Sequence, residues 1–260
     1  MAGVEKITMT TAYDAPTISI IEEVGIDIVL VGDSVGKVVL GYEDTLPVTI
    51  DEMLHHTKAV NRASESTLIV TDIPFLSYGI DESDTIRNAG RLIKEGGADA
   101  VKIESSPQHI RTINRLVDLG IPVMAHLGFT PQHIKQLGGY KQSSSTEKAA
   151  EQLITTAQDH ESAGVFSIVL EHVPSRIAEQ VTEQVNIPTI GIASGPHTDG
   201  QVLVINDITG LSTDVPPFAK QFSNVHENII DALSSYKTEV KRGEFPAQEH
   251  SNIEELDNLY

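Results

Sequence analysis

Acidic side chains follow three short apolar runs of this sequence, at the point where each run ends. The acids are Asp33, Asp72 and Glu104. Carboxylates that lie close together repel one another and raise one another's pKa unless a cation lies between them. Mg²⁺ suits such a place, because it binds a few carboxylates, retains water and leaves positions for a chelating substrate. For each acid alone, capping of the next helix is the simpler interpretation, but their recurrence favours one shared magnesium site.

Other polar residues end apolar runs in the same way. Lys102 and Glu104 are two apart in VKIE, so both side chains point to the same face of a strand. A buried lysine needs an anionic partner, either Glu104 or a ligand carboxylate; the alternative is a surface salt bridge, which the apolar flanks disfavour. Glu171 is a candidate general base if partial burial raises its pKa, with helix capping as an open alternative. For His126 the pattern alone favours a core histidine over a ligand.

Strand and helix patterns alternate along nearly the whole chain. The runs that indicate strands buried on both faces are 7–12, 26–32, 67–71, 98–103, 121–125, 166–170 and 187–193, with a weaker candidate at 201–205. Helical spacing marks 50–62, 83–94, 146–163 and 224–241. This alternation predicts a parallel sheet, and the number of runs predicts a closed (β/α)₈ TIM barrel. An open nucleotide-binding sheet is disfavoured, because residues 13–16 cannot form its Gly-rich turn.

A barrel brings the carboxyl ends of its strands to one rim, where these acids would become neighbours. We predict a single catalytic domain over 1–260, with a C-terminal helix at about 224–241 and a polar tail at 243–260. The segments 40–49 and 128–145 are expected to be long loops at the rim that act as lids or bind ligands. The small-residue segment 191–196 is either a phosphate-binding loop or a tight turn.

Composition excludes several classes of function. The 260 residues contain Cys 0, so thiol nucleophiles, disulfides and thiolate metal sites are absent. Lys and Arg number 18 against 37 Asp and Glu, a net charge of -19 without a basic stripe, which argues against a nucleic-acid partner. We interpret the charge as a solvated acidic surface suited to high salt, with a cation-rich partner as the alternative. No apolar stretch is long enough for a membrane span and the N-terminus lacks a signal-peptide pattern, so a cytoplasmic location is expected.

The same residues lie in ordered blocks that resemble the ketopantoate hydroxymethyltransferase family over about residues 6–251. The blocks include TAYDAPT (11–17), VGDSVG (31–36), LGYEDTLPVT (40–49), TDIPF (71–75), GADAVKIE (97–104), PVMAHLGFTPQ (122–132), VLEHVP (169–174), IPTIGIASG (187–195) and FPAQEHS (245–251). A chance match of so many ordered blocks is implausible.

The resemblance implies a reaction and a role for each residue. It implies transfer of a hydroxymethyl group from 5,10-methylenetetrahydrofolate to 3-methyl-2-oxobutanoate through a magnesium-stabilised enolate, giving 2-dehydropantoate and tetrahydrofolate in pantothenate and coenzyme A biosynthesis. The implied magnesium ligands are Asp33, Asp72 and Glu104. The implied substrate contacts are Asp33, Ser34, Asp72, Lys102 and His126, and the implied catalytic base is Glu171. The partners would be the keto acid, a reduced folate and further copies of the chain, because the family forms large rings that are commonly decamers.

The sequence departs from the family pattern in the segment 142–145, which reads QSSS, and at His172, Ala193 and Ser194. The first departure leaves the lid and the donor contacts open, and the donor itself is either tetrahydrofolate or another pterin carrier. Two alternative functions remain. One is a related barrel lyase that cleaves a 2-hydroxy or phosphonate acid, although its usual catalytic cysteine is missing here. The other is a non-catalytic barrel that binds a metal or metabolite.

Overall fold

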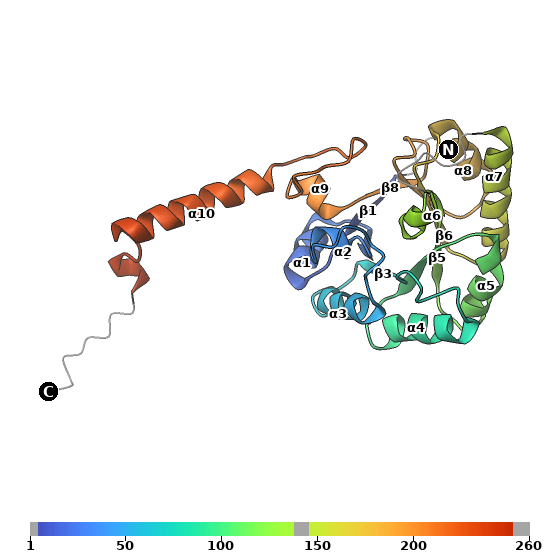
Figure 1. The fold of residues 1–260 in the computed structure, drawn as a ribbon, viewed down its shortest axis with the longest axis horizontal. Helices are drawn as coiled ribbons and strands as arrows, with labels where there is room; N and C mark the ends of the chain where they lie inside the picture. Colours follow the sequence, from blue (N-terminus) through green and yellow to red (C-terminus); the bar gives the residue numbers. More distant parts are fainter. Residues whose placement is uncertain (1–4, 138–145, 252–260) are drawn as a thin grey trace. The chain divides into compact units, whose positions relative to one another are not determined.

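The computed structural model describes residues 5–137 and 146–251 and forms a closed barrel of eight parallel strands. The strands follow one another around the barrel in chain order (Figure 1). Their bounds are β1 Ile7–Thr11, β2 Ile28–Val31, β3 Leu68–Asp72, β4 Ala100–Glu104, β5 Val123–Gly128, β6 Ser167–Glu171, β7 Thr189–Ile192 and β8 Gly200–Leu203. The prediction of a (β/α)₈ barrel is therefore confirmed, including the weak run that becomes β8.

Longer helices lie outside the strands (Figure 1). Their bounds are α1 Ala15–Val24, α3 Ile50–Asn61, α4 Glu82–Lys94, α5 Ile110–Asp118, α7 Glu147–Ser162 and α8 Ser175–Gln184. Shorter elements lie between a strand and its helix: α2 Val35–Val38, η1 Pro107–His109, η2 Pro131–His133 and α6 Ile134–Leu137. Local sequence sets the helix ends. At the start of α3, for example, Thr49 and Glu52 exchange hydrogen bonds in a capping box, which satisfies two backbone N–H groups.

Side chains alternate between two cores because successive residues of a strand point to opposite faces. The barrel interior is filled by Met9, Ile28, Leu30, Val70, Ala100, Met124, Val169, Ile190 and Val202. A larger apolar layer joins the outer faces of the strands to the helices. Residues two apart in a strand point to the same face, so a polar residue two positions after an interior residue also points into the barrel. Asp72 follows Val70, His126 follows Met124 and Glu171 follows Val169, so each faces the barrel axis at the rim.

The two long rim loops differ in structure. Residues 40–49 run without a helix or strand until α3 begins, as predicted. The segment 128–145 contains η2 and α6, which the sequence pattern did not indicate, and its residues 138–145 lie outside the described residues. In the segment 191–196, residues 191 and 192 end β7 and the remaining residues form a turn. This turn is held by Ser194, whose hydroxyl donates to Leu170 O at 2.8 Å and accepts from Val173 N–H at 3.1 Å. This internal use of Ser194 favours the tight turn over the phosphate-binding loop.

The chain divides into two compact units, Met1–Ile205 and Asn206–Tyr260. The second unit contains α9 Ile205–Thr209, which begins at the boundary, α10 Val225–Arg242 and η3 Gln248–His250. Within it, the N–H of Phe222 donates to Ile208 O at 2.8 Å, which holds the segment before α10 against α9. Helix α10 confirms the predicted C-terminal helix, whereas the single domain over 1–260 stays a prediction. Tail residues 252–260 lie outside the described part, within which no helix is long and apolar enough to cross a membrane.

Candidate active site

The carboxylates of Asp33, Asp72 and Glu104 are buried at the carboxyl ends of β2, β3 and β4. Their relative exposures are 7%, 3% and 3%, so water does not solvate them as it would on a surface. Asp72 Oδ2 accepts the backbone N–H of Asp33 at 3.0 Å, which ties the ends of β2 and β3 together. Asp72 Oδ1 lies 2.7 Å from Lys102 Nζ on the neighbouring strand β4. The predicted convergence of acids at one rim is therefore present in the structure.

The helix-capping alternative does not hold for these carboxylates. The residue that precedes α2 at its N-cap is Ser34, and that of η1 is Ser106. Glu171 does not cap α8 either, because Pro174 occupies its N-cap. The alternative of a surface salt bridge for Lys102 also fails, since the lysine is only 6% exposed. These charged residues lie at the mouth of the barrel, which is the rim formed by the carboxyl ends of its strands. The strands, and not helix capping, determine their positions.

Burial raises the pKa of two of these acids, Asp33 and Glu104. Burial and the charge of Asp72 together raise the pKa of Asp33 to about 7. Burial and the charge of Asp33 raise the pKa of Glu104 well above its ordinary value. Although burial works against it, the charges of Asp72, Asp33 and Glu104 raise the pKa of Lys102. One ammonium group therefore faces more negative charge than it can neutralise, so the site favours an additional cation.

His126 connects the acid cluster to Glu171. Its Nδ1 lies 3.3 Å from Lys102 Nζ and 3.9 Å from Glu104 Oε1, and its Nε2 lies 3.2 Å from Glu171 Oε2. Burial and the charge of Lys102 lower the pKa of His126, so the ring is neutral near neutral pH. Glu171 is 7% exposed and belongs to the same buried mouth. His126 is therefore not an isolated core histidine, which was the interpretation that the pattern alone favoured.

Ser34 lies beside Asp33 and contacts a buried tyrosine that the sequence analysis did not single out. Tyr13 Oη and Ser34 Oγ are 2.8 Å apart. Burial raises the pKa of Tyr13, which keeps its hydroxyl protonated. Gly32 allows this packing, because a Cβ there would lie 2.7 Å from Ser34 Oγ and 3.5 Å from Asp72 Oδ2. The half-buried Ser34 hydroxyl thus remains at the mouth next to the carboxylates.

Gln132 is the second residue that the sequence analysis missed, and it contacts the mouth from η2. Its side-chain Nε2 donates to Asp33 Oδ2 at 2.8 Å and to Ile73 O at 3.1 Å. Its backbone N–H donates to Glu104 Oε2 at 2.9 Å. Its position in the block PVMAHLGFTPQ was the only signal available, because η2 shows no periodic pattern. Gln132 therefore joins the ends of three strands over the acid cluster.

Comparison with known proteins assigns the chain to a family. The sequence pattern of the family described as ketopantoate hydroxymethyltransferase matches residues 1–248. A 3-methyl-2-oxobutanoate hydroxymethyltransferase of Haloarcula marismortui is 52% identical over 261 residues, which cover 100% of this chain and 97% of the relative. An enzyme of the same name from Halobacterium salinarum is 51% identical and covers 98% of this chain and 94% of the relative. The chain belongs to the ketopantoate hydroxymethyltransferase family.

Solved structures outside the ketopantoate hydroxymethyltransferase family contain a barrel similar to that of this chain. A crystal structure of phosphonopyruvate hydrolase superimposes with a TM-score of 0.60 and covers 95% of this chain and 88% of that one. Its sequence identity is only 11%, so the likeness concerns the fold. The barrel lyase alternative therefore has support from architecture alone, whereas the hydroxymethyltransferase family matches at the level of sequence.

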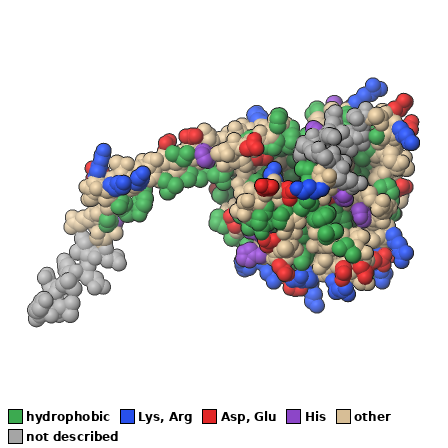
Figure 2. Space-filling view, in the orientation of Figure 1, with side chains coloured by type: hydrophobic (Ala, Val, Ile, Leu, Met, Phe, Trp, Pro, Cys, Tyr) green, Lys and Arg blue, Asp and Glu red, His purple; other side chains and the backbone are tan. Residues whose placement is uncertain are grey.

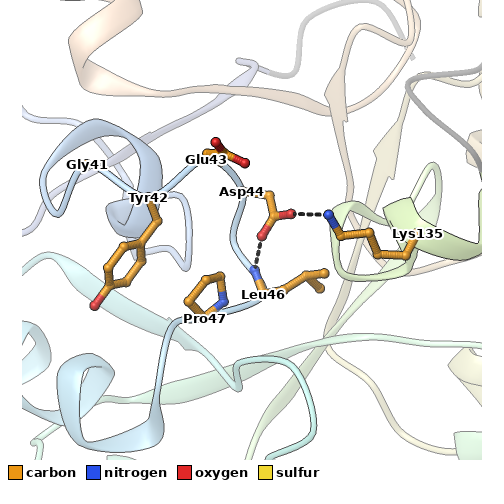
Figure 3. Close-up of a pocket in the computed structure, with 7 residues that line it drawn as sticks. All are labelled: Gly41, Tyr42, Glu43, Asp44, Leu46, Pro47 and Lys135. Atoms are coloured by element: carbon orange, nitrogen blue, oxygen red, sulfur yellow. Dashed lines mark hydrogen bonds and ion pairs between the residues drawn. The ribbon is translucent and has the colours of Figure 1, made fainter.

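The segment 41–47, within the family block LGYEDTLPVT, forms a pocket with Lys135 of α6 (Figure 3). Asp44 pairs with Lys135 at 3.1 Å and accepts the N–H of Leu46 at 3.1 Å. Tyr42 donates its hydroxyl to Glu52 outside the pocket at 2.6 Å. The charges of Asp44 and Lys135 largely satisfy each other. The pocket shows that the two long loops meet, which is consistent with their predicted role as lids or binding loops.

Proposed function

We propose that this protein transfers a hydroxymethyl group to 3-methyl-2-oxobutanoate, giving 2-dehydropantoate for pantothenate and coenzyme A biosynthesis. The one-carbon donor in this proposal is 5,10-methylenetetrahydrofolate, which leaves as tetrahydrofolate, and the enzyme acts in the cytoplasm. The observation that carries the proposal is the chain of contacts from Asp72 through Lys102 and His126 to Glu171, beside Asp33 and Glu104. A family relative at 52% identity bears the name of this activity.

Magnesium is part of the proposal, with Asp33, Asp72 and Glu104 as its ligands. The donor set fits, because these are hard oxygen ligands whose negative charge exceeds that of the one ammonium group near them. Among the described residues, no group of three or more His, Asp or Glu side chains lies close enough to enclose a metal ion. Mg²⁺ is compatible with this spacing, since one or two of the three carboxylates would bind it directly, the third would bind it through water, and water and substrate would complete its shell. The related phosphonopyruvate hydrolase was solved with oxalate and Mg²⁺.

In this proposal, each side chain at the mouth has a separate role in the reaction. When bound, magnesium would withdraw electrons from the keto acid and lower the energy of its enolate. Lys102 and Ser34 hold the substrate carboxylate through charge and a hydroxyl. Glu171 accepts the proton from C3, and the electron pair of that C–H bond enters the enolate. The enolate carbon then forms a bond to the methylene carbon of the donor while the bond from that carbon to one folate nitrogen breaks. Water displaces the second folate nitrogen and supplies the oxygen of the hydroxymethyl group. The two nitrogens take up the C3 proton and one proton of water, which gives tetrahydrofolate.

The proposal is tested by following the C3 proton. The protein is incubated with magnesium and 3-methyl-2-oxobutanoate in deuterated water, and exchange at C3 is followed by NMR, with and without chelator. Exchange that requires the cation, followed by 2-dehydropantoate formation when the folate donor is added, is the expected result. A lyase would instead split a 2-hydroxy acid, and a non-catalytic binder would give neither exchange nor product. Replacing the folate with another reduced pterin carrier decides between the two donors.

Self-association is also part of the proposal, and α10 supports it. Ile229, Leu233, Tyr236 and Val240 recur at intervals of four, three and four residues, which places them on one stripe of the helix. Their side chains are 44%, 61%, 56% and 43% exposed, and hydrophobic groups are visible along this helix in Figure 2. An apolar stripe of this size left in water is unfavourable, so we propose that a second copy of the chain covers it.

The barrel offers a second apolar surface of the same kind. Glu22 of α1 accepts hydrogen bonds from residues 64–67 on the β3 side, so Ile20 and Val24 lie on the flank that faces β8. They are 63% and 70% exposed. The helix that would cover this flank is one that follows β8, and the barrel unit ends at Ile205, two residues after β8. Within the described part of the barrel unit, this flank therefore has no helical neighbour. A helix from another copy would fill that place.

The oligomer is tested with one variant on the stripe and one beside it. Leu233→Glu puts a charge on the apolar stripe and is expected to lower the molar mass measured by light scattering after size exclusion. Ser234→Glu adds the same charge on the opposite side of α10 and is expected to leave the mass unchanged. A wild-type mass of ten chains would support the decamer that is common in the family. A wild-type mass of one chain would contradict self-association.

A further inference from the structure

Gln132 lies where the three strand ends that carry acids meet. The residue is 3% exposed, and its three hydrogen bonds reach Asp33 on the β2 side, Ile73 after β3 and Glu104 on β4. Two of these bonds end on proposed magnesium ligands, and the third ends on the residue next to Asp72. A single side chain and its backbone N–H therefore fix the separation of β2, β3 and β4 at the rim.

The orientation of the Gln132 amide follows from its partners. Asp33 Oδ2 and Ile73 O are both acceptors, so the side-chain atom that faces them must be the NH₂ group. The carbonyl oxygen Oε1 consequently points elsewhere, and it has no hydrogen-bond partner among the residues that the structure describes. Leaving a buried carbonyl oxygen without a hydrogen-bond partner is unfavourable. A glutamine side chain that only filled space would form hydrogen bonds through both its NH₂ group and its carbonyl oxygen. Here only the NH₂ group is bonded, to Asp33 Oδ2 and Ile73 O, so its contacts are directed to the acid cluster and the strand end beside it.

We propose that Gln132 is a positioning residue that assembles the carboxylate cluster for its cation, and this inference rests on the proposed magnesium site. The Nε2 group neutralises part of the charge of Asp33 and stops this carboxylate from turning away from Asp72. The backbone N–H does the same for Glu104. The free Oε1 is left to accept a hydrogen bond from an O–H donor that enters the mouth, such as water that accompanies the cation.

The inference is tested by measuring cation binding directly, without turnover. Mn²⁺ serves as the probe, because its binding is followed by electron paramagnetic resonance and by calorimetry. Gln132→Met keeps the length of the side chain and removes its hydrogen bonds. We expect Mn²⁺ affinity to fall about 10–100-fold, as for other residues that orient metal ligands. Exchange of the C3 proton should recover in this variant when the cation is raised to saturation, which a general loss of structure would not allow.

Gln201→Met is the matched control. Gln201 also donates two hydrogen bonds through Nε2, to Gly195 O and Thr198 Oγ1 at 2.9 Å each, but these contacts lie away from the acids. Its substitution is expected to leave Mn²⁺ affinity unchanged. Gln132→Asn guards against misfolding of the methionine variant, because it keeps an amide that is too short to reach both acceptors. Its affinity should lie between those of wild type and Gln132→Met.

The outcomes separate this inference from the function on which it rests. Wild-type protein that fails to bind Mn²⁺ would contradict the proposed magnesium site itself. Wild-type protein that binds Mn²⁺, with unchanged affinity in both Gln132 variants, would overturn only the positioning role of Gln132. An equal loss of affinity in Gln201→Met would show that the effect comes from general destabilisation, and would likewise overturn it.

Discussion

His126 Nε2 lies 3.2 Å from Glu171 Oε2, and this pair fixes the tautomer of the histidine. The other ring nitrogen, Nδ1, lies 3.3 Å from Lys102 Nζ. An ammonium group only donates hydrogen bonds, so Nδ1 must be the acceptor and the ring proton resides on Nε2. The neutral imidazole therefore turns its N–H toward Glu171 Oε2, which orients this carboxylate at the barrel mouth.

Glu171→Gln tests the role of this carboxylate as the base. The amide keeps the size of the side chain and cannot accept the C3 proton, so exchange at C3 should fall by about 10²–10⁴-fold. Binding of the keto acid, measured by calorimetry with magnesium present, should persist, since Lys102 and Ser34 are unchanged. Glu183→Gln, which changes an exposed acid on α8, should keep full exchange. Exchange at the wild-type rate in Glu171→Gln would remove this residue as the base.

Lys102→Met should harm both stability and substrate binding. Lys102 and Asp72 form a buried pair at 2.7 Å, and removing one partner of such a pair costs about 3–5 kcal/mol because the other charge stays buried. Denaturant unfolding of the cation-free protein measures this loss. Keto-acid affinity should also fall, because the substrate carboxylate loses its ammonium partner. Added magnesium should restore part of the stability by neutralising Asp72.

Lys135→Met provides the comparison for this loss. Lys135 pairs with Asp44 at 3.1 Å, but its side chain is 77% exposed. An exposed pair contributes about 0–1 kcal/mol, so the variant should unfold close to wild type. Equal destabilisation by the two substitutions would contradict the buried character of the Lys102 pair.

The strands and the acids at their ends could be predicted from the sequence alone, because these features repeat along the chain. Strands buried on both faces produce apolar runs, and the period of two then places Asp72 and Glu171 at the rim without further information. Gln132 has no such pattern. It lies in the 3₁₀ turn η2, and its role exists only because the loop after β5 closes over β2, β3 and β4. The contact between Tyr13 and Ser34 depends on packing across strands in the same way. Family resemblance supplied the substrate, which neither periodicity nor geometry identifies.

Gly128 controls the position of Glu171 and is expected to tolerate no side chain. It adopts φ 98, and a Cβ there would lie 2.4 Å from Glu171 O and 2.7 Å from Val173 Cγ2. Gly128→Ala should therefore cost about 1–2 kcal/mol for the left-handed backbone and a further 1–3 kcal/mol, roughly, for overpacking. Exchange at C3 should fall as well, because the strand end that carries Glu171 must shift.

Gly120→Ala separates the two contributions. Gly120 has φ 82, and a Cβ there would have nothing within 4 Å. Denaturant unfolding should show only the backbone cost of about 1–2 kcal/mol, with C3 exchange unchanged. Equal stability and equal C3 exchange in the two alanine variants would show that the close approach of Gly128 to the Glu171 backbone affects neither property.

Glu22 should make the stability of the barrel depend on pH in the acid range. Hydrogen bonds from the backbones of Ser66 and Thr67 and from Ser64 lower the pKa of Glu22 to about 2. A carboxyl with a lowered folded pKa stabilises the protein above its unfolded pKa, about 4.3, and loses this contribution as pH falls through the folded pKa. Glu22→Gln should therefore lower the melting temperature near neutral pH, and the difference from wild type should shrink as pH falls from about 5 to 2.

Glu23→Gln is the control on the same helix, since its side chain is exposed. It should change the melting temperature little at any pH. A difference between Glu22→Gln and wild type that stays constant across the acid range would show that the carboxylate charge is not what holds residues 64–67.

The acidic surface should make stability depend on salt. With 37 acidic and 18 basic residues, the net charge of -19 causes self-repulsion, which is screened when the Debye length falls to about 3 Å near 1 M salt. The melting temperature of wild type should therefore rise from dilute buffer to about 1 M KCl. Salt also strengthens apolar burial, so a variant with exposed Glu23, Glu65 and Glu183 changed to Gln serves as reference. Its rise should be smaller, because it has less repulsion to screen. Full thermal stability of wild type in dilute buffer would count against adaptation to high salt.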